Sequence, residues 1–209
     1  MSILSVDVPD VDSLGIIADR LLEKVDQPSY LCGFSFGGYV VLEMYRKAPE
    51  LVKGLILMGS TTEADTTAQF EGRKNSIGRA RRGEYFDMVE ANASLTFSPA
   101  GLEDTQLMEK RKKIVRDYGP ERFISHVTAA MHRQDYTELL SHANLPVLIV
   151  AGGEDRLFSP ERLKELAGRI PGADFEIIEK TGHMMPMEQP QQIVQVLGQW
   201  IQNQEGKKG

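Results

Sequence analysis

Short apolar runs of strand length alternate along this chain with amphipathic segments of helix length. The runs that we expect to form strands are residues 3–8, 30–33, 54–59, 146–151 and 175–179. The segments that we expect to form helices are residues 14–25, 36–47, 160–168 and 190–202. Apolar strands that alternate with helices build a mostly parallel sheet with helices on both faces. The predicted fold class is therefore α/β.

The middle of the chain departs from this alternation. Residues 61–143 show helical patterning and no convincing strand, although strand-length runs lie on either side. We interpret residues 61–143 as a helical insertion, or lid, over one end of the sheet. Residues 1–60 and 144–209 then form the α/β core.

A glycine-rich motif lies between the second apolar run and the helix that follows it. Residues 33–38 read Gly-Phe-Ser-Phe-Gly-Gly, which is Gly-x-Ser-x-Gly with one further glycine. The glycines two positions either side let the backbone pass closely, so that Ser35 can occupy a strained turn at the N-terminus of a helix. The alternative is a glycine-rich turn without chemistry, or one that holds a phosphate.

A serine hydroxyl needs a base within hydrogen-bond reach, and the chain has four histidines. His126 and His132 fall in the helical middle, six residues apart, and we interpret them as surface residues. His142 reads as a solvated loop histidine. His183 follows the fifth apolar run and therefore lies at the same edge of the sheet as Ser35, where ligands bind in open parallel sheets.

An acid must orient the base, and three candidates lie at the same edge. Glu154 and Asp155 come directly after the fourth run, and Glu63 comes just after the third. Spacing alone does not choose among them. The order serine, acid, histidine along the chain is the order found in α/β-fold hydrolases.

At these residues the chain resembles the α/β-hydrolase superfamily, and within it the small lidded carboxylesterases similar to pimeloyl-[acyl-carrier protein] methyl ester esterase. The segments that carry the resemblance are residues 33–38, 152–160 and 181–190. The resemblance implies that Ser35 is the nucleophile, His183 the general base and then acid, and Asp155 the residue that orients His183, with Glu63 as a fallback. It also implies that the Phe36 backbone amide is one oxyanion donor.

The implied activity is that of a serine hydrolase that cleaves a carboxylic ester through an acyl-enzyme. Phe34, Phe36, Tyr39 and Met184 are candidates to contact the substrate, together with Met185 and Met187. The alternative for these side chains is ordinary core packing. Two alternative functions are a catalytically weak or silent binding protein, and a related lyase or carbon–carbon bond hydrolase with the same three residues.

The chain also departs from the resemblance at its start. Members of the family open with an antiparallel hairpin and a strand that ends in His-Gly or Pro-Gly, and its loop supplies the second oxyanion donor. The fold expected here is N-terminally shortened. We hypothesise that residues 3–8 pair with residues 30–33 and that an amide of residues 7–10 approaches Ser35. Completion of the sheet by a second copy of the chain is the alternative.

Composition narrows the partners and the compartment. The net charge is −6, whereas a nucleic-acid binder normally carries a basic footprint. Cys32 is the single cysteine, so neither an internal disulfide nor a cysteine-rich zinc site is expected, and we interpret it as a buried core residue. We expect no cofactor and no metal. The N-terminus does not read as a secretory signal and no apolar run is long enough for a membrane span, so we expect a cytoplasmic protein.

Two basic segments lie in the helical middle. Residues 73–82 and 110–116 each carry five basic side chains and no acidic one. Such segments could steer an anionic substrate or an acidic carrier protein towards the site. The alternative is that they are solvated helix faces.

Overall fold

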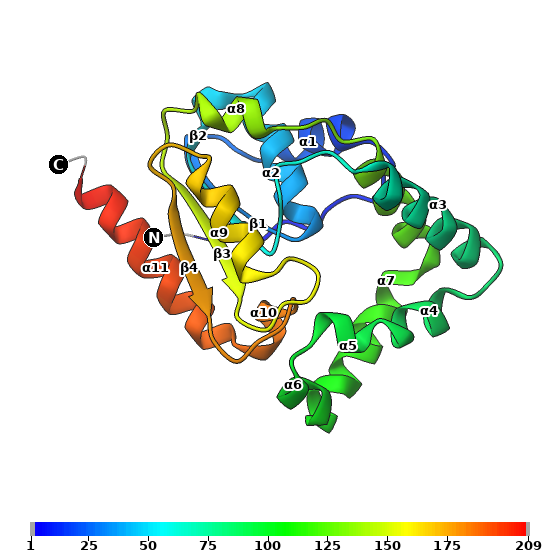
Figure 1. Cartoon of the computed structure of the whole chain (residues 1–209). Coiled ribbons are helices and arrows are strands. Elements are labelled where there is room, and N and C mark those ends of the chain that lie inside the picture. The colour runs from blue at the N-terminus through cyan, green and yellow to red at the C-terminus, as the bar shows by residue number, and fades with distance from the viewer. Residues whose placement is uncertain (1–2, 208–209) are drawn as a thin grey trace.

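The computed structural model describes residues 3–207 and contains one parallel sheet (Figure 1). Its strands are β1 (Ser29–Phe34), β2 (Val52–Met58), β3 (Val147–Gly152) and β4 (Asp174–Ile178), in the spatial order β1-β2-β3-β4. Each of them coincides with an apolar run of the sequence. The predicted α/β class, a parallel sheet flanked by helices, is confirmed.

The helices of the α/β part cover both faces of this sheet. They are α1 (Leu14–Leu22), α2 (Phe36–Lys47), the short 3-10 helix η1 (Pro49–Leu51), α9 (Pro160–Gly168), α10 (Met185–Glu188) and α11 (Pro190–Gly206). Successive strand residues point to opposite faces, and β2 follows this rule. Leu55 and Leu57 pack with residues of α2 and α9, whereas Ile56 and Met58 pack with residues of α11. The central strand β3 is buried along its whole length, and its residues are accordingly apolar throughout.

Between β2 and β3 the chain forms helices and no strand. They are α3 (Thr67–Arg81), α4 (Tyr85–Ala91), α5 (Ala93–Thr96), α6 (Pro99–Glu103), α7 (Thr105–Met131) and α8 (Thr137–Ser141). Figure 1 shows α3 to α7 to one side of the sheet, whereas α8 returns to it, and Tyr136 and Leu140 join the core beside β3. Helix α7 is kinked at Gly119, where φ is 74° and a proline follows.

The expected first strand is wrong, because residues 3–8 form no strand and β1 pairs only with β2 within the described chain. Side-chain contacts from α7 hold this segment instead. Arg122 binds the Asp7 carboxylate at 2.7 Å and the carbonyl oxygen of Val8 at 2.6 Å. Ile3, Leu4 and Val6 are exposed, Ile3 to 82%, and within this run Val8 packs against the core cluster of α1 and α2.

The interpretation of Cys32 as a core residue is also wrong. Its side chain is exposed, although Tyr30 and Phe34 on the same face of β1 pack against the cluster of α11. Strand β1 lies at the edge of the sheet, and an edge strand is covered less completely than the central β2 and β3.

Candidate active site

Ser35 occupies the turn that joins β1 to α2. Its backbone has φ 50° and ψ −113°, a conformation that a residue with a side chain rarely adopts. The Ser35 amide donates a hydrogen bond to the carbonyl oxygen of Met58 at 2.8 Å, which ties the turn to β2. The hydroxyl therefore stands at the N-terminus of α2, where the helix dipole favours negative charge.

Two of the three glycines around Ser35 are required by close contacts. A Cβ atom on Gly33 would lie 2.3 Å from the carbonyl oxygen of Gly37, and one on Gly38 would lie 2.2 Å from the Oγ atom of Ser60. A Cβ atom on Gly37 would meet nothing within 4 Å. The expectation that both glycines two positions from Ser35 permit close approach therefore holds for Gly33, whereas on the helix side the close approach is at Gly38.

Two hydrogen bonds connect the serine, the histidine and the aspartate that the sequence singled out. The Ser35 Oγ atom lies 2.9 Å from His183 Nε2, and His183 Nδ1 lies 2.8 Å from Asp155 Oδ2. These side chains come from the loops after β1, β4 and β3. The imidazole crosses the end of β2 at Gly59, where a Cβ atom would lie 3.1 Å from the ring. The glycine at this position leaves room for His183 to reach Ser35.

The geometry separates Asp155 from its neighbour Glu154. The Asp155 side chain is buried, and its Oδ1 atom accepts hydrogen bonds from the amides of Leu157 at 2.8 Å and Phe158 at 3.0 Å. These bonds stabilise the carboxylate and leave Oδ2 directed at His183. Glu154 is exposed to solvent. Of the two acids, the structure brings Asp155 to the histidine.

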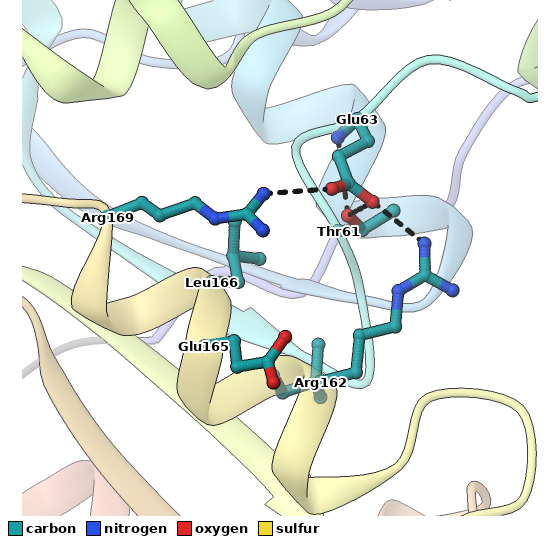
Figure 2. Close-up of a pocket in the computed structure, with 7 residues that line it drawn as sticks. Thr61, Glu63, Arg162, Glu165, Leu166 and Arg169 are labelled. Atoms are coloured by element: carbon teal, nitrogen blue, oxygen red, sulfur yellow. Dashed lines mark hydrogen bonds and ion pairs between the residues drawn. The ribbon is translucent and has the colours of Figure 1, made fainter.

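Glu63, the third candidate acid, is occupied elsewhere. Its carboxylate forms ion pairs with Arg162 at 2.8 Å and Arg169 at 3.3 Å, beside a cavity of about 300 Å³ (Figure 2). The hydrogen bond from Arg162 holds the pKa of Glu63 below its usual value. The structure gives the fallback acid no contact with His183.

Among the other histidines, the interpretation of His126 as a surface residue is wrong. His126 is buried, its ring stacks on Phe36 with centroids 4.6 Å apart, and its Nε2 atom lies 2.9 Å from the carbonyl oxygen of Pro9. Burial lowers the pKa of this imidazole. The spacing of residues along a helix face does not reveal the kink of α7 or the packing of the N-terminal segment, and both contribute to the burial of His126. His132 and His142 are exposed, as expected.

Two aromatic rings lie close to His183. The Phe34 ring lies 5.2 Å from the imidazole and the Phe158 ring 5.8 Å, measured between centroids. Phe34 was a candidate from the sequence, whereas Phe158 was missed, although it lies only three residues after Asp155. These rings make an apolar surround for the imidazole.

The other residues that the sequence predicted to contact the substrate are buried or half-buried. Tyr39 is 4% exposed, packs in the cluster of α1 and α2, and has the Arg133 guanidinium 4.2 Å from its ring centre, which is the arrangement that core packing predicts. Met184 directly follows His183 and is half-buried, and its amide donates to the carbonyl oxygen of Thr96 at 2.9 Å. Met185 is fully buried in the cluster of α11.

The predicted oxyanion donors differ in their support. Phe36 is the first residue of α2, a position whose amide has no partner within the helix. The second expected donor was an amide of residues 7–10. Within the described chain no hydrogen bond joins these amides to Ser35, and the carbonyl oxygens of Val8 and Pro9 bind side chains of α7.

Most of the basic side chains in the helical middle are paired with carboxylates. Four of the five in residues 73–82 and three of the five in residues 110–116 form such pairs. Pairing cancels much of the local positive field. This arrangement favours solvated helix faces over a steering surface.

Membrane-spanning helices and metal sites are two further features to consider in residues 3–207. No helix there is long and apolar enough to cross a membrane. The same residues bring together no group of three or more His, Cys, Asp or Glu side chains that could hold a metal ion.

Comparisons with known proteins agree with the fold. A family model described as alpha/beta hydrolase fold matches residues 7–190. A pimeloyl-[acyl-carrier protein] methyl ester esterase of Neisseria meningitidis is 27% identical over 184 residues, which cover 85% of this chain and 71% of the relative. A 2-hydroxy-6-oxononadienedioate/2-hydroxy-6-oxononatrienedioate hydrolase of a Pseudomonas species is 23% identical, with 81% and 61% covered.

Solved structures resemble the chain over nearly all of its length. A thermophilic esterase from Thermogutta terrifontis, solved with malate bound, superposes with a TM-score of 0.87 at 26% identity, covering 96% of this chain and 75% of that one. An enol-lactonase from Burkholderia xenovorans superposes with a TM-score of 0.76 at 16% identity, covering 91% and 73%, and supports the fold alone. The chain therefore belongs to the alpha/beta hydrolase fold family and is an enzyme of the esterase-like kind.

Proposed function

We propose that this chain is a serine esterase that cleaves a carboxylic ester through an acyl-enzyme. The observation that carries the proposal is the pair of hydrogen bonds that connects Ser35 to His183 at 2.9 Å and His183 to Asp155 at 2.8 Å. A nucleophile, a base and an orienting acid in hydrogen-bond contact are what this chemistry requires.

In the first half-reaction, His183 Nε2 takes the proton of Ser35 while Oγ attacks the ester carbonyl carbon. The carbonyl oxygen becomes an oxyanion, which the Phe36 amide at the start of α2 stabilises. The tetrahedral intermediate then collapses, the carbon–oxygen bond to the alcohol breaks, and the leaving alkoxide takes the proton from His183. Asp155 keeps the Nδ1 proton in place and stabilises the imidazolium that forms in between.

The second half-reaction repeats these steps with water. His183 takes a proton from a water molecule, which attacks the acyl carbon. The carboxylic acid leaves as Ser35 recovers its proton from His183. Atoms and charges balance over the cycle, with one ester and one water consumed and one acid and one alcohol released.

The relatives and the walls of the site support an ester substrate. Two of the compared proteins are named as esterases, and Phe34 and Phe158 place apolar surface beside His183. We propose that residues 61–143 act as the lid of this site. An acidic carrier protein as bearer of the ester has less support, because most of the basic side chains of the lid are already paired with carboxylates.

Labelling with a fluorophosphonate tests the proposal. The reagent phosphonylates a serine that an adjacent base activates, so wild-type protein takes up one label and Ser35→Ala takes up none. Ser94→Ala, at an exposed serine of α5, is the matched control and labels as the wild type does. No labelling of folded wild-type protein would overturn the proposal in favour of a catalytically silent binding protein.

Carbon–carbon bond hydrolysis is the second candidate. The observation that favours it is the relative named as a 2-hydroxy-6-oxononadienedioate/2-hydroxy-6-oxononatrienedioate hydrolase. Such an enzyme would also label at Ser35. Turnover of p-nitrophenyl esters but not of vinylogous 1,5-diketones supports the esterase, and the reverse preference supports the second candidate.

A further inference from the structure

The carboxylate of Glu188 joins the histidine loop to the helical segment 96–101. Glu188 is the last residue of α10, five positions after His183. Its Oε1 atom accepts hydrogen bonds from the Gly182 amide at 2.9 Å and from the Thr181 hydroxyl at 3.0 Å. Its Oε2 atom accepts from the amide and the hydroxyl of Ser98, at 3.0 Å and 2.5 Å. Each carboxylate oxygen therefore serves one of the two segments.

The hydroxyl groups that bind Glu188 belong to buried residues. Ser98 is 2% exposed and Thr181 is 0% exposed. The Ser98 hydroxyl also accepts from the Gly101 amide at 3.0 Å and so caps the N-terminus of α6. Hydrogen bonds between a charged acceptor and buried donors are stronger than those between neutral groups. The Glu188 carboxylate is thus the centre of a fixed junction rather than a surface group that happens to lie near it.

Both neighbours of His183 in the chain are held against the helical segment. A Cβ atom on Gly182 would lie 2.7 Å from the carbonyl carbon of Phe97 and 2.8 Å from the Ser98 amide nitrogen, so the backbones touch. On the other side of the histidine, the Met184 amide donates to the carbonyl oxygen of Thr96 at 2.9 Å. His183 therefore projects from a backbone that is anchored before and after it.

From this arrangement we infer that Glu188 is a positioning residue for His183. Through Glu188, the position of residues 96–101 determines how the imidazole is aligned with Ser35. The inference rests on the proposed function, because it assigns a role to the support of the proposed base. Glu188 does not touch the reacting atoms. It fixes the backbone of residues 181 and 182, and Asp155 fixes the ring.

The chemistry of the junction explains why a carboxylate is needed there. All of its partners are donors, two amides and two hydroxyls. A glutamine of the same shape has one acceptor oxygen, and its NH2 group would face donors on one side of the junction. Glu188→Gln is therefore a nearly isosteric change that breaks the connection to one of the two segments.

The test compares Glu188→Gln with the wild type by hydrolysis of p-nitrophenyl butyrate and by the second-order rate of fluorophosphonate labelling. Both rates are normalised to folded protein measured by near-ultraviolet circular dichroism. A displacement of a catalytic group by about 1 Å can cost up to about a hundredfold in rate. We expect kcat and the labelling rate to fall together, by about tenfold to a hundredfold, with KM changed less than about twofold.

Glu103→Gln is the matched control, because it removes one negative charge from an exposed position of α6. It is expected to keep the wild-type rates. Ser98→Ala is the second variant, since it removes one donor from the junction and keeps the carboxylate, and it is expected to lower the same two rates by a smaller factor. Should Glu188→Gln fail to fold, Ser98→Ala alone decides.

The outcomes separate the inference from the function beneath it. If the role of Glu188 is purely structural, Glu188→Gln will have a lower urea midpoint but unchanged rates per folded molecule. This result would overturn the inference, and so would unchanged rates in folded Ser98→Ala. Neither result would contradict the proposed esterase activity. Failure of the wild type to label would overturn the proposed function itself.

Discussion

Gly38 packs directly against Ser60, so that a Cβ atom at position 38 would lie 2.5 Å from the Ser60 Cβ and 2.2 Å from its Oγ. Ser60 is fully buried at the end of β2. Rotation of the hydroxyl could relieve the contact with Oγ but not the contact with Cβ. The close approach of α2 to the end of β2, which supports the turn at Ser35, therefore depends on the absence of a side chain at position 38.

We predict that Gly38→Ala lowers the free energy of unfolding by about 1–3 kcal/mol, the usual cost of overpacking a filled site. Gly37→Ala is the control, because nothing lies within 4 Å of its Cβ position, and it should be neutral or stabilising by up to about 1 kcal/mol. Urea unfolding measures both. Ser60→Gly should restore most of the loss in the Gly38→Ala background, and a double variant as unstable as the single one would contradict the account.

Asp155→Asn should lower kcat by roughly a thousandfold to ten-thousandfold, with folding retained. The asparagine Oδ1 atom can still accept hydrogen bonds from the amides of Leu157 and Phe158, whereas its NH2 group cannot accept the hydrogen bond that His183 Nδ1–H donates. Steady-state hydrolysis of p-nitrophenyl butyrate is the measurement. Glu154→Gln, one position earlier and exposed, should keep the wild-type kcat, and a larger loss there than in Asp155→Asn would assign the acid to Glu154.

His126 should make the protein less stable as the pH falls. Its burial lowers the pKa in the folded state below the unfolded value, so the unfolded chain binds a proton first as the pH drops through about 6.5. Stability is then full above the unfolded pKa and is lost progressively below it. Urea unfolding at pH 7.5 and pH 5.5 should show a smaller loss for His126→Gln than for the wild type.

The exposed His132 provides the control for this pH dependence. His132→Gln should lose as much stability between the two pH values as the wild type does, because this substitution removes an exposed side chain and leaves the buried His126 in place. If His126→Gln and the wild type lose stability equally, burial of His126 does not contribute to the acid sensitivity of the fold.

Arg133 and Asp65 form a buried ion pair, and removal of one partner should destabilise the fold. The two side chains are 1% and 2% exposed and lie 2.6 Å apart, and they connect the end of α7 to the loop after β2. Asp65→Ala leaves the guanidinium without this partner, so we expect a loss of about 3–5 kcal/mol in the free energy of unfolding. Asp117→Ala, which removes the exposed pair with Lys113, should cost less than about 1 kcal/mol. Equal losses would contradict the ranking by burial.

The strands and the serine turn could be predicted from the sequence because their signals are local. An apolar run of strand length predicts a strand, and Gly-x-Ser-x-Gly predicts a tight turn, from neighbouring residues alone. Strands β1 to β4 lie at the predicted runs. The prediction of a strand at residues 3–8 was wrong, because a strand also needs a neighbouring strand to pair with. The sequence of an apolar run does not show whether such a neighbour is present. The predicted burial of Cys32 was wrong for a related reason, because the burial of a strand residue depends on whether its strand lies at the edge of the sheet.

The candidate site was predictable only to the level of loops. The ends of parallel strands meet at one edge, which placed Ser35, Asp155 and His183 together, but spacing could not separate Asp155 from Glu154. In the structure, two amides hold the Asp155 carboxylate with its Oδ2 atom 2.8 Å from His183 Nδ1, whereas Glu154 is exposed. Glu188 was missed because its role lies in contacts with Ser98, ninety residues away in the chain, and no local pattern records such a contact.

Trapping of the acyl-enzyme tests the central claim most directly. Folded protein is mixed with p-nitrophenyl butyrate, quenched in acid within milliseconds and digested, and the peptides are weighed by mass spectrometry. A butyryl group on Ser35 that forms with the burst of p-nitrophenol, and that is absent in Ser35→Ala, is the predicted result. Turnover without any adduct on Ser35, or with a butyryl group on another residue that turns over at the same rate, would contradict it.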